Sequence, residues 1–279
     1  AEADIMDFGT LTHSALEVLA DPGLKDANER SIFSAMKEKL ESEVNRRYGR
    51  NPGLSILQQK ASIERRLEKV ARDRVVEKRE GWEIVKVEEK FILDTCGSGD
   101  PWKWRIMNKR DDPLQSNRSV RVVGMIDRID CNQETGSFRV LDYKTSSKGP
   151  EKLHIRGGTV RMEEYPECAR FLEGEKVRHW TDLQLPLYRL WAEKALITRS
   201  GQNIGVGIYN LPAKEEEIGI SLWAGLDDEL MRKAMKCAVG VIGDLLDPAE
   251  HQPISKVDYD DFEDLFFHSP HEAIEGFER

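Results

Sequence analysis

The stretch VRVVGMIDRIDCNQETGSFRVLDYKTSS, residues 120–147, consists of two apolar strands joined by a short polar turn. Asp127 interrupts the first strand, and Asp142 and Lys144 interrupt the second. Because side chains alternate between the two faces of a strand, Asp127 falls in an otherwise apolar row, and Asp142 shares its face with Lys144. Charges at positions that the pattern assigns to a core indicate a functional site.

The turn sets the pairing of these two strands. If QETG (133–136) is a four-residue loop, Asn132 pairs with Ser137, and the same register places Asp127 opposite Asp142. Directly opposed residues have Cβ atoms about 4.5–5.5 Å apart, and two half-buried carboxylates at that distance repel unless a proton or a cation lies between them. Mg²⁺ and Mn²⁺ prefer oxygen ligands, so the pattern favours a divalent metal site. The competing interpretation is an Asp–Lys ion pair at a solvated sheet edge.

Helical and strand patterns alternate around this hairpin. Apolar spacing predicts helices over 7–21, 27–49, 54–81, 181–196 and 227–246, and strands over 82–93, 201–212 and 216–223. Residues 148–179 show no sustained period, which is typical of a long loop that is functional or mobile. The order predicts an α/β fold with a central mixed β-sheet flanked by helices and a helical N-terminal extension.

The chain is expected to form a single domain over residues 1–279. Its expected parts are a helical segment (1–80), a mixed-sheet core (81–247) and an acidic tail (248–279). The first residue is Ala rather than Met, which favours the C-terminal part of a longer protein.

Composition excludes some classes of protein. The chain has no signal peptide and no apolar stretch of about 20 residues, so no membrane association is expected. Its four cysteines form no CxxC pair, which argues against zinc, iron–sulfur and disulfide frameworks and suits a cytoplasmic location. The net charge of −9 disfavours nucleic acid as a partner, but residues 54–80 carry eight basic against five acidic side chains. DNA therefore stays open as a partner.

Four motifs together resemble one known family. GMID (124–127) followed by VLDYKT (140–145) resembles the paired motifs of the RecB/AddB-like branch of the PD-(D/E)XK nuclease superfamily. GTLTHSALE (9–17) resembles that family's G-x-x-x-H helix, and DLQLPLYRL (182–190) resembles its QxxxY helix. The resemblance covers residues 9–196 and implies a restriction-endonuclease-like core with metal-dependent DNA nuclease activity, acting as an exonuclease in end processing, recombination or repair.

The resemblance also implies roles for individual residues. The expected catalytic residues are Asp127, Asp142 and Lys144; the expected ligands of Mg²⁺ or Mn²⁺ are His13, Asp127, Asp142 and the carbonyl oxygen of Tyr143; the expected substrate-binding residues are Gln184, Tyr188, Thr145 and Arg128. The implied partners are DNA and a helicase region on the same or another chain. The cysteine quartet that many relatives use for an iron–sulfur cluster is missing, so no cluster is expected.

The residues themselves leave alternatives open. His13 lies more than about 100° from the apolar side of its helix, which fits a ligand or a solvated surface histidine. Gln184 and Tyr188 share one helical face, which fits a site or ordinary packing. For Glu88 an exposed strand charge is expected rather than a place in the site. The basic side chains of the 148–179 loop suit phosphate binding or a solvated insertion; they are Lys148, Lys152, His154, Arg156 and Arg161.

Two other functions compete with the nuclease. One is a catalytically inactive relative that binds DNA or scaffolds a complex, and the other is a protein-interaction module that uses the acidic tail. The presence of Asp127, Asp142 and Lys144 favours the active enzyme. Exonuclease or endonuclease action, and Lys144 as base or as charge stabiliser, stay open at this level.

Overall fold

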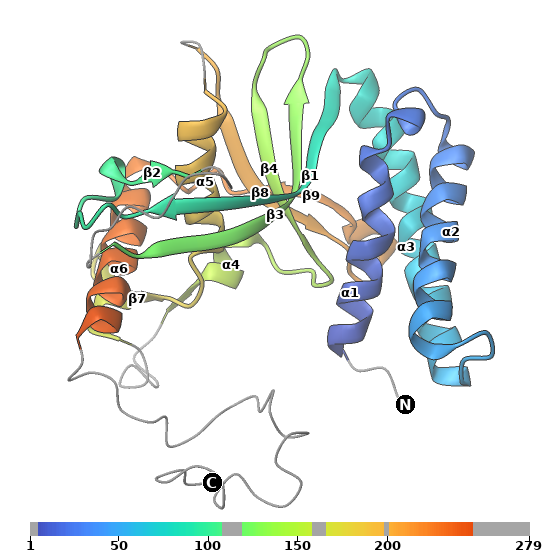
Figure 1. Cartoon of the computed structure of the whole chain (residues 1–279), viewed down its shortest axis with the longest axis horizontal. Coiled ribbons are helices and arrows are strands. Elements are labelled where there is room, and N and C mark those ends of the chain that lie inside the picture. The colour runs from blue at the N-terminus through green and yellow to red at the C-terminus, as the bar shows by residue number, and fades with distance from the viewer. Residues whose placement is uncertain (1–4, 108–118, 158–165, 198–200, 248–279) are drawn as a thin grey trace, which may run out of the picture.

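The computed structural model describes residues 5–107, 119–157, 166–197 and 201–247 (Figure 1). Its helices are α1 (Ile5–Leu16), α2 (Glu29–Tyr48), α3 (Leu54–Arg79), α4 (Pro150–His154), α5 (Gln184–Ala195) and α6 (Asp228–Leu246). Its strands are β1 (Trp82–Asp94), β2 (Arg105–Ile106), β3 (Arg121–Asn132), β4 (Phe138–Lys144), β5 (Ile155–Gly157), β6 (Arg170–Glu173), β7 (Lys176–Trp180), β8 (Ile204–Asn210) and β9 (Gly219–Leu222). Short 3₁₀ turns are η1 (Glu17–Ala20), η2 (Pro22–Leu24), η3 (Pro101–Lys103), η5 (Glu167–Ala169) and η6 (Glu215–Glu217).

The central sheet has six strands in the order β2-β1-β3-β4-β8-β9. It is mixed, because β4 and β8 run parallel while the other neighbours are antiparallel. The β4–β8 connection contains α5, as a parallel pair requires. Figure 1 shows α1, α2 and α3 on one side of the sheet and α5 and α6 on the other. The predicted α/β fold with a helical N-terminal part is confirmed.

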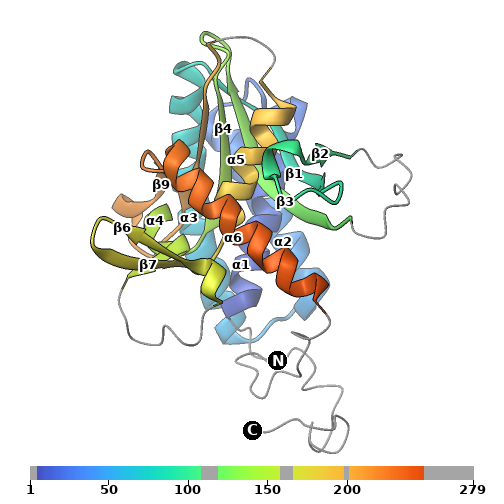
Figure 2. The same cartoon turned by 90° about the vertical axis from the view of Figure 1, so that its left-hand side faces the viewer.

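Two apolar clusters fill the two sides of the sheet. One joins α1, α2 and α3 to aromatic side chains of the central strands, Tyr143 and Tyr209. The other joins the opposite face to α5 and α6 through residues such as Val140, Ile208 and Trp191. Figure 2 shows α6 crossing in front of this second side. Strands β4 and β8 are therefore covered on both faces, which explains their nearly continuous apolar sequence.

A network of buried charges fastens α3 to the sheet. Arg128 of β3 is completely buried and contacts Glu77 of α3, and its Nε lies 2.7 Å from Asp130 Oδ1. Arg139 of β4 reaches the same two acids, at 3.1 Å and 2.5 Å. The prediction that Arg128 binds substrate is therefore wrong, because its guanidinium contacts Glu77 and Asp130 inside the protein and has no access to solvent.

The sequence pattern predicts a loop over residues 148–179, and that prediction is wrong for the described part of the segment. It contains α4 and a second, three-stranded sheet in the order β5-β7-β6. These strands have three to five residues, which is too short for a periodic pattern to show in the sequence. Arg161 and the acidic tail (248–279) lie outside the described residues.

Candidate active site

The candidate site lies where β3 and β4 separate. Their ladder has the predicted register, from Cys131–Phe138 to Arg128–Leu141. At the turn, the Asn132 N–H donates to the Ser137 carbonyl oxygen at 2.8 Å. The ladder ends at Arg128–Leu141, one pair before Asp127 and Asp142.

Beyond this point the Asp127 side chain takes the place of a backbone acceptor. Its Oδ2 accepts the N–H of Tyr143 at 2.7 Å. The predicted register is thus confirmed, but Asp127 and Asp142 are not a ladder pair. Both are buried, with 8% and 2% of their surface exposed.

Asp142 is held by two side chains that share its surroundings. Its Oδ1 accepts Nε2 of Gln184 at 2.8 Å, and its Oδ2 lies 2.7 Å from Lys144 Nζ. Burial and the nearby charge of Asp127 raise the pKa of Asp142 to about 6, against the opposing charges of Lys144 and His13. A buried carboxyl group beside a second carboxylate favours a proton or a cation between the two.

His13 reaches this point from α1. Its Nε2 lies 3.1 Å from the Tyr143 carbonyl oxygen and its Nδ1 lies 3.6 Å from Asp127 Oδ2. Burial favours the neutral ring, but the hydrogen bond and charge of Asp127, with the charge of Asp142, outweigh it and raise the pKa of His13. Three of the expected ligands, His13, Asp127 and the Tyr143 carbonyl, therefore lie together.

The sequence predicts an exposed strand charge at Glu88, whereas the structure shows a half-buried side chain. It lies on β1 between the pairs Val87–Arg128 and Glu89–Ile126, and therefore beside Asp127. One oxygen or nitrogen from each of His13, Glu88 and Asp127 lies within 4.8 Å of the others. Burial and the charge of Asp127 raise the pKa of Glu88.

The backbone at Glu88 adopts φ 48°, a left-handed conformation that costs a non-glycine residue on the order of 1 kcal/mol or more. Such strain persists where surrounding structure enforces it. The sequence carried no signal for this conformation, because a local alternating pattern continues through VEEKF.

Gln184 and Tyr188 support the site from α5. Gln184 accepts from Lys144 Nζ at 3.2 Å and donates to both Asp142 and the Tyr188 hydroxyl, the latter at 2.7 Å. Tyr188 is 2% exposed, and its hydroxyl donates to the Met125 carbonyl oxygen. Direct substrate binding by Tyr188 is therefore contradicted by its burial, and the pair fixes Asp142 and Lys144 in place.

The glycine of the GMID motif has a packing role. A Cβ at Gly124 would lie 2.5 Å from the ring of Phe91, its cross-strand partner. Phe91 meets Tyr188 edge to face, with ring centroids 5.7 Å apart. Because residue 124 has no side chain, the Phe91 ring can pack between β3 and α5. Helix α5 carries Gln184.

The donor atoms suit a hard divalent cation. Four donor groups converge: the carboxylates of Asp127 and Glu88, the His13 imidazole and the Tyr143 carbonyl. Asp142 lies on the adjoining strand, where it forms an ion pair with Lys144. Oxygen-rich sets of this kind bind Mg²⁺ or Mn²⁺. Thr145, expected to bind substrate, follows directly on β4 and is half-buried.

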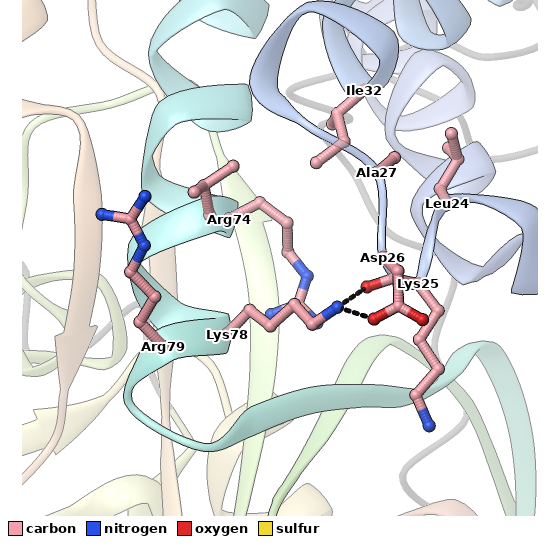
Figure 3. A pocket seen from close by; sticks show the side chains of 9 residues that line it. Leu24, Lys25, Asp26, Ala27, Ile32, Arg74, Lys78 and Arg79 are labelled. Atoms are coloured by element: carbon pink, nitrogen blue, oxygen red, sulfur yellow. Dashed lines mark hydrogen bonds and ion pairs between the residues drawn. The ribbon is translucent and has the colours of Figure 1, made fainter.

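A pocket of about 240 Å³ lies elsewhere, between the η2 turn and α3 (Figure 3). Lys78 crosses it to contact Asp26, and Arg74 at its wall donates to the Trp82 carbonyl at 2.8 Å. Lys78 and Asp26 thus pair with each other, and none of the site residues above lines the pocket. We therefore place the candidate chemistry at the β3–β4 separation.

Comparison with known proteins identifies the family of the chain. A family model described as the PD-(D/E)XK nuclease superfamily matches residues 1–268. A comparison with curated proteins gave no match. Within the described part of the chain, no helix has the length and apolar character needed to cross a bilayer.

Proposed function

This chain belongs to the PD-(D/E)XK nuclease superfamily, and from that premise we propose that it is a metal-dependent DNA exonuclease acting in DNA end processing, recombination or repair. The observation that carries the proposal is the set of two buried carboxylates on neighbouring strands, Asp127 and Asp142, with an ammonium group 2.7 Å from the second. A helicase region on the same or another chain stays a prediction, as does the absence of an iron–sulfur cluster.

The converging donors are Asp127, Glu88, His13 and the Tyr143 carbonyl, and Asp142 adjoins them on β4. We assign these five groups as the ones that would hold Mg²⁺ or Mn²⁺. Such an ion, when bound, lowers the pKa of its water and neutralises charge that develops on the phosphate. Of these ligands, Glu88 is added on the structure alone.

Lys144 supplies positive charge on the open side of the site. Its side chain is 32% exposed, so its Nζ can meet a phosphate while it stays bonded to Gln184. In that place it orients the attacking water or stabilises the charge on the pentacovalent phosphorus. Gln184 acts as a positioning residue, because it holds Asp142 and Lys144 from one amide group. Thr145 stays a proposed substrate contact.

The test is cleavage of linear and circular DNA, single- and double-stranded, with Mg²⁺, Mn²⁺ or EDTA. We expect metal-dependent degradation of linear DNA that is abolished by Asp142→Ala and by Lys144→Ala while the circular dichroism spectrum is unchanged. Lys214→Ala is the matched control, because it removes a surface lysine that is also ion-paired, 3.1 Å from Glu217. Degradation by either site variant at the rate of the unmodified protein would refute the assignment, and a native protein that binds but never cleaves DNA would favour the inactive relative.

A further inference from the structure

Beyond the candidate site, β1 and β3 continue side by side as a two-stranded ribbon. The ladder pairs Lys90 with Met125, Ile92 with Val123 and Asp94 with Arg121. β4 does not pair with β3 beyond Arg128, so this part of β3 has β1 as its sole strand neighbour in the described sheet. Figure 1 shows the ribbon leaving the centre of the sheet on the side away from α1.

The two faces of the ribbon differ. Phe91 and Leu93 belong to the apolar cluster under α5 and α6. Because neighbours alternate, Lys90, Met125 and Val123 lie on the other face. Val123 is 66% exposed and Met125 39% exposed, so this face shows apolar side chains to solvent.

Cationic side chains flank these apolar side chains. Lys90 and Arg121 are exposed, and no hydrogen bond or ion pair of either side chain with another described residue is present. The charge of Lys90 acts on Glu88, two residues away, and so reaches the acidic cluster itself. The face thus begins at the candidate metal ligands and carries exposed positive charge along about 20 Å of strand, from Asp127 to Arg121.

We propose that this face, formed by Lys90, Ile92, Val123, Met125 and Arg121 and called here the ribbon face, binds the single strand of DNA that leads to the cleaved bond. The inference rests on the proposed nuclease function and adds its substrate class. Lys90 and Arg121 contact phosphates, and Val123 and Met125 contact the flat faces of bases. Duplex DNA hides those faces in its stack, whereas a single strand exposes them.

Binding is measured by fluorescence anisotropy of labelled single-stranded and hairpin duplex DNA in EDTA, which prevents cleavage. The double variant Val123→Ser with Met125→Ser should bind the single strand about tenfold more weakly and bind the duplex within twofold of native. Leu222→Ser is the matched control, a 46%-exposed leucine on the edge strand β9, and it should bind both as native does. Thermal unfolding of each variant establishes that it is folded.

The salt dependence isolates the phosphate contact. Lys90→Ala should reduce the slope of log K against log salt by about 0.7 for single-stranded DNA, the value for one phosphate contact. Lys236→Ala, an exposed lysine on α6, should leave the slope unchanged.

Native single-strand affinity in the double variant would overturn the inference, and an equal loss of duplex affinity would assign the face to duplex instead. Metal-dependent cleavage by the native protein distinguishes these failures from failure of the nuclease function, since it persists if only the ribbon face is wrong.

Discussion

Replacing Asp142 by asparagine tests the electrostatics of the site without DNA. The pKa of Asp142 is raised from its usual 3.8 to about 6, because the carboxyl group is buried and lies near Asp127. In the folded protein this group keeps its proton up to about pH 6, whereas in the unfolded chain it loses the proton near pH 3.8. Folding stability contributed by this group is therefore present at low pH and is lost as the pH rises through 6.

The size of the effect follows from the shift. A difference of about two pKa units between folded and unfolded states corresponds to about 3 kcal/mol in full, of which about 2 kcal/mol falls between about pH 4.5 and about pH 7.5. Asparagine does not titrate. The free energy of unfolding of Asp142→Asn, relative to the native protein, should thus rise by about 2 kcal/mol over that range.

The assay is urea unfolding in EDTA, followed by circular dichroism at both pH values. Asp26→Asn is the control, because the ion pair with Lys78 lowers the pKa of the exposed Asp26 carboxyl below its usual value. That carboxyl is ionised in both the folded and the unfolded state at both pH values, so the stability of Asp26→Asn relative to the native protein should not change between them. Parallel pH profiles for Asp142→Asn and the native protein would refute the electrostatic account of the site.

Metal addition supplies the second half of this test. At pH 7.5, Mn²⁺ at about 100 times its dissociation constant should stabilise the native protein by about 2.7 kcal/mol, and the gain should be much smaller for Asp142→Asn. An equal gain in both proteins would place the ion away from Asp142.

Substitutions at three further positions test the surroundings of the site. Glu88→Gly and Glu88→Ala should both weaken Mn²⁺ binding in calorimetry at least about tenfold. The glycine variant should be about 1 kcal/mol more stable to unfolding than the alanine variant, because glycine adopts φ 48° without strain. Equal stabilities of the two variants would contradict the left-handed backbone. Gly124→Ala should cost about 1–3 kcal/mol in urea unfolding because its Cβ meets the Phe91 ring, whereas Gly149→Ala, with no atom within 4 Å, should cost little. Arg128→Met should cost about 3–5 kcal/mol, since it strands buried acids, and a cost below about 1 kcal/mol would argue against the network.

The local chain explains why some elements were predictable. The apolar period identified α2, α3 and α6, and capping residues reinforce two of them: Asn28 accepts the Ser31 N–H at 2.9 Å and Asp227 accepts the Leu230 N–H at 2.8 Å. The hairpin register was predictable because loop length fixes it. The strands β5, β6 and β7 were missed because each is too short to show a period.

For the candidate site, the sequence by itself determined which chemistry is present: Asp127, Asp142 and Lys144 on two strands whose alternation is a property of every extended backbone. The resemblance implied His13 as a further ligand, and the placement of α1 brings it to the site. The tertiary structure alone decided two other residues. Glu88 joins the site through its left-handed backbone in β1, and Arg128 is excluded because it contacts Glu77, 51 residues away. Spacing along a strand is local and readable, whereas contacts between distant elements depend on how the whole core packs.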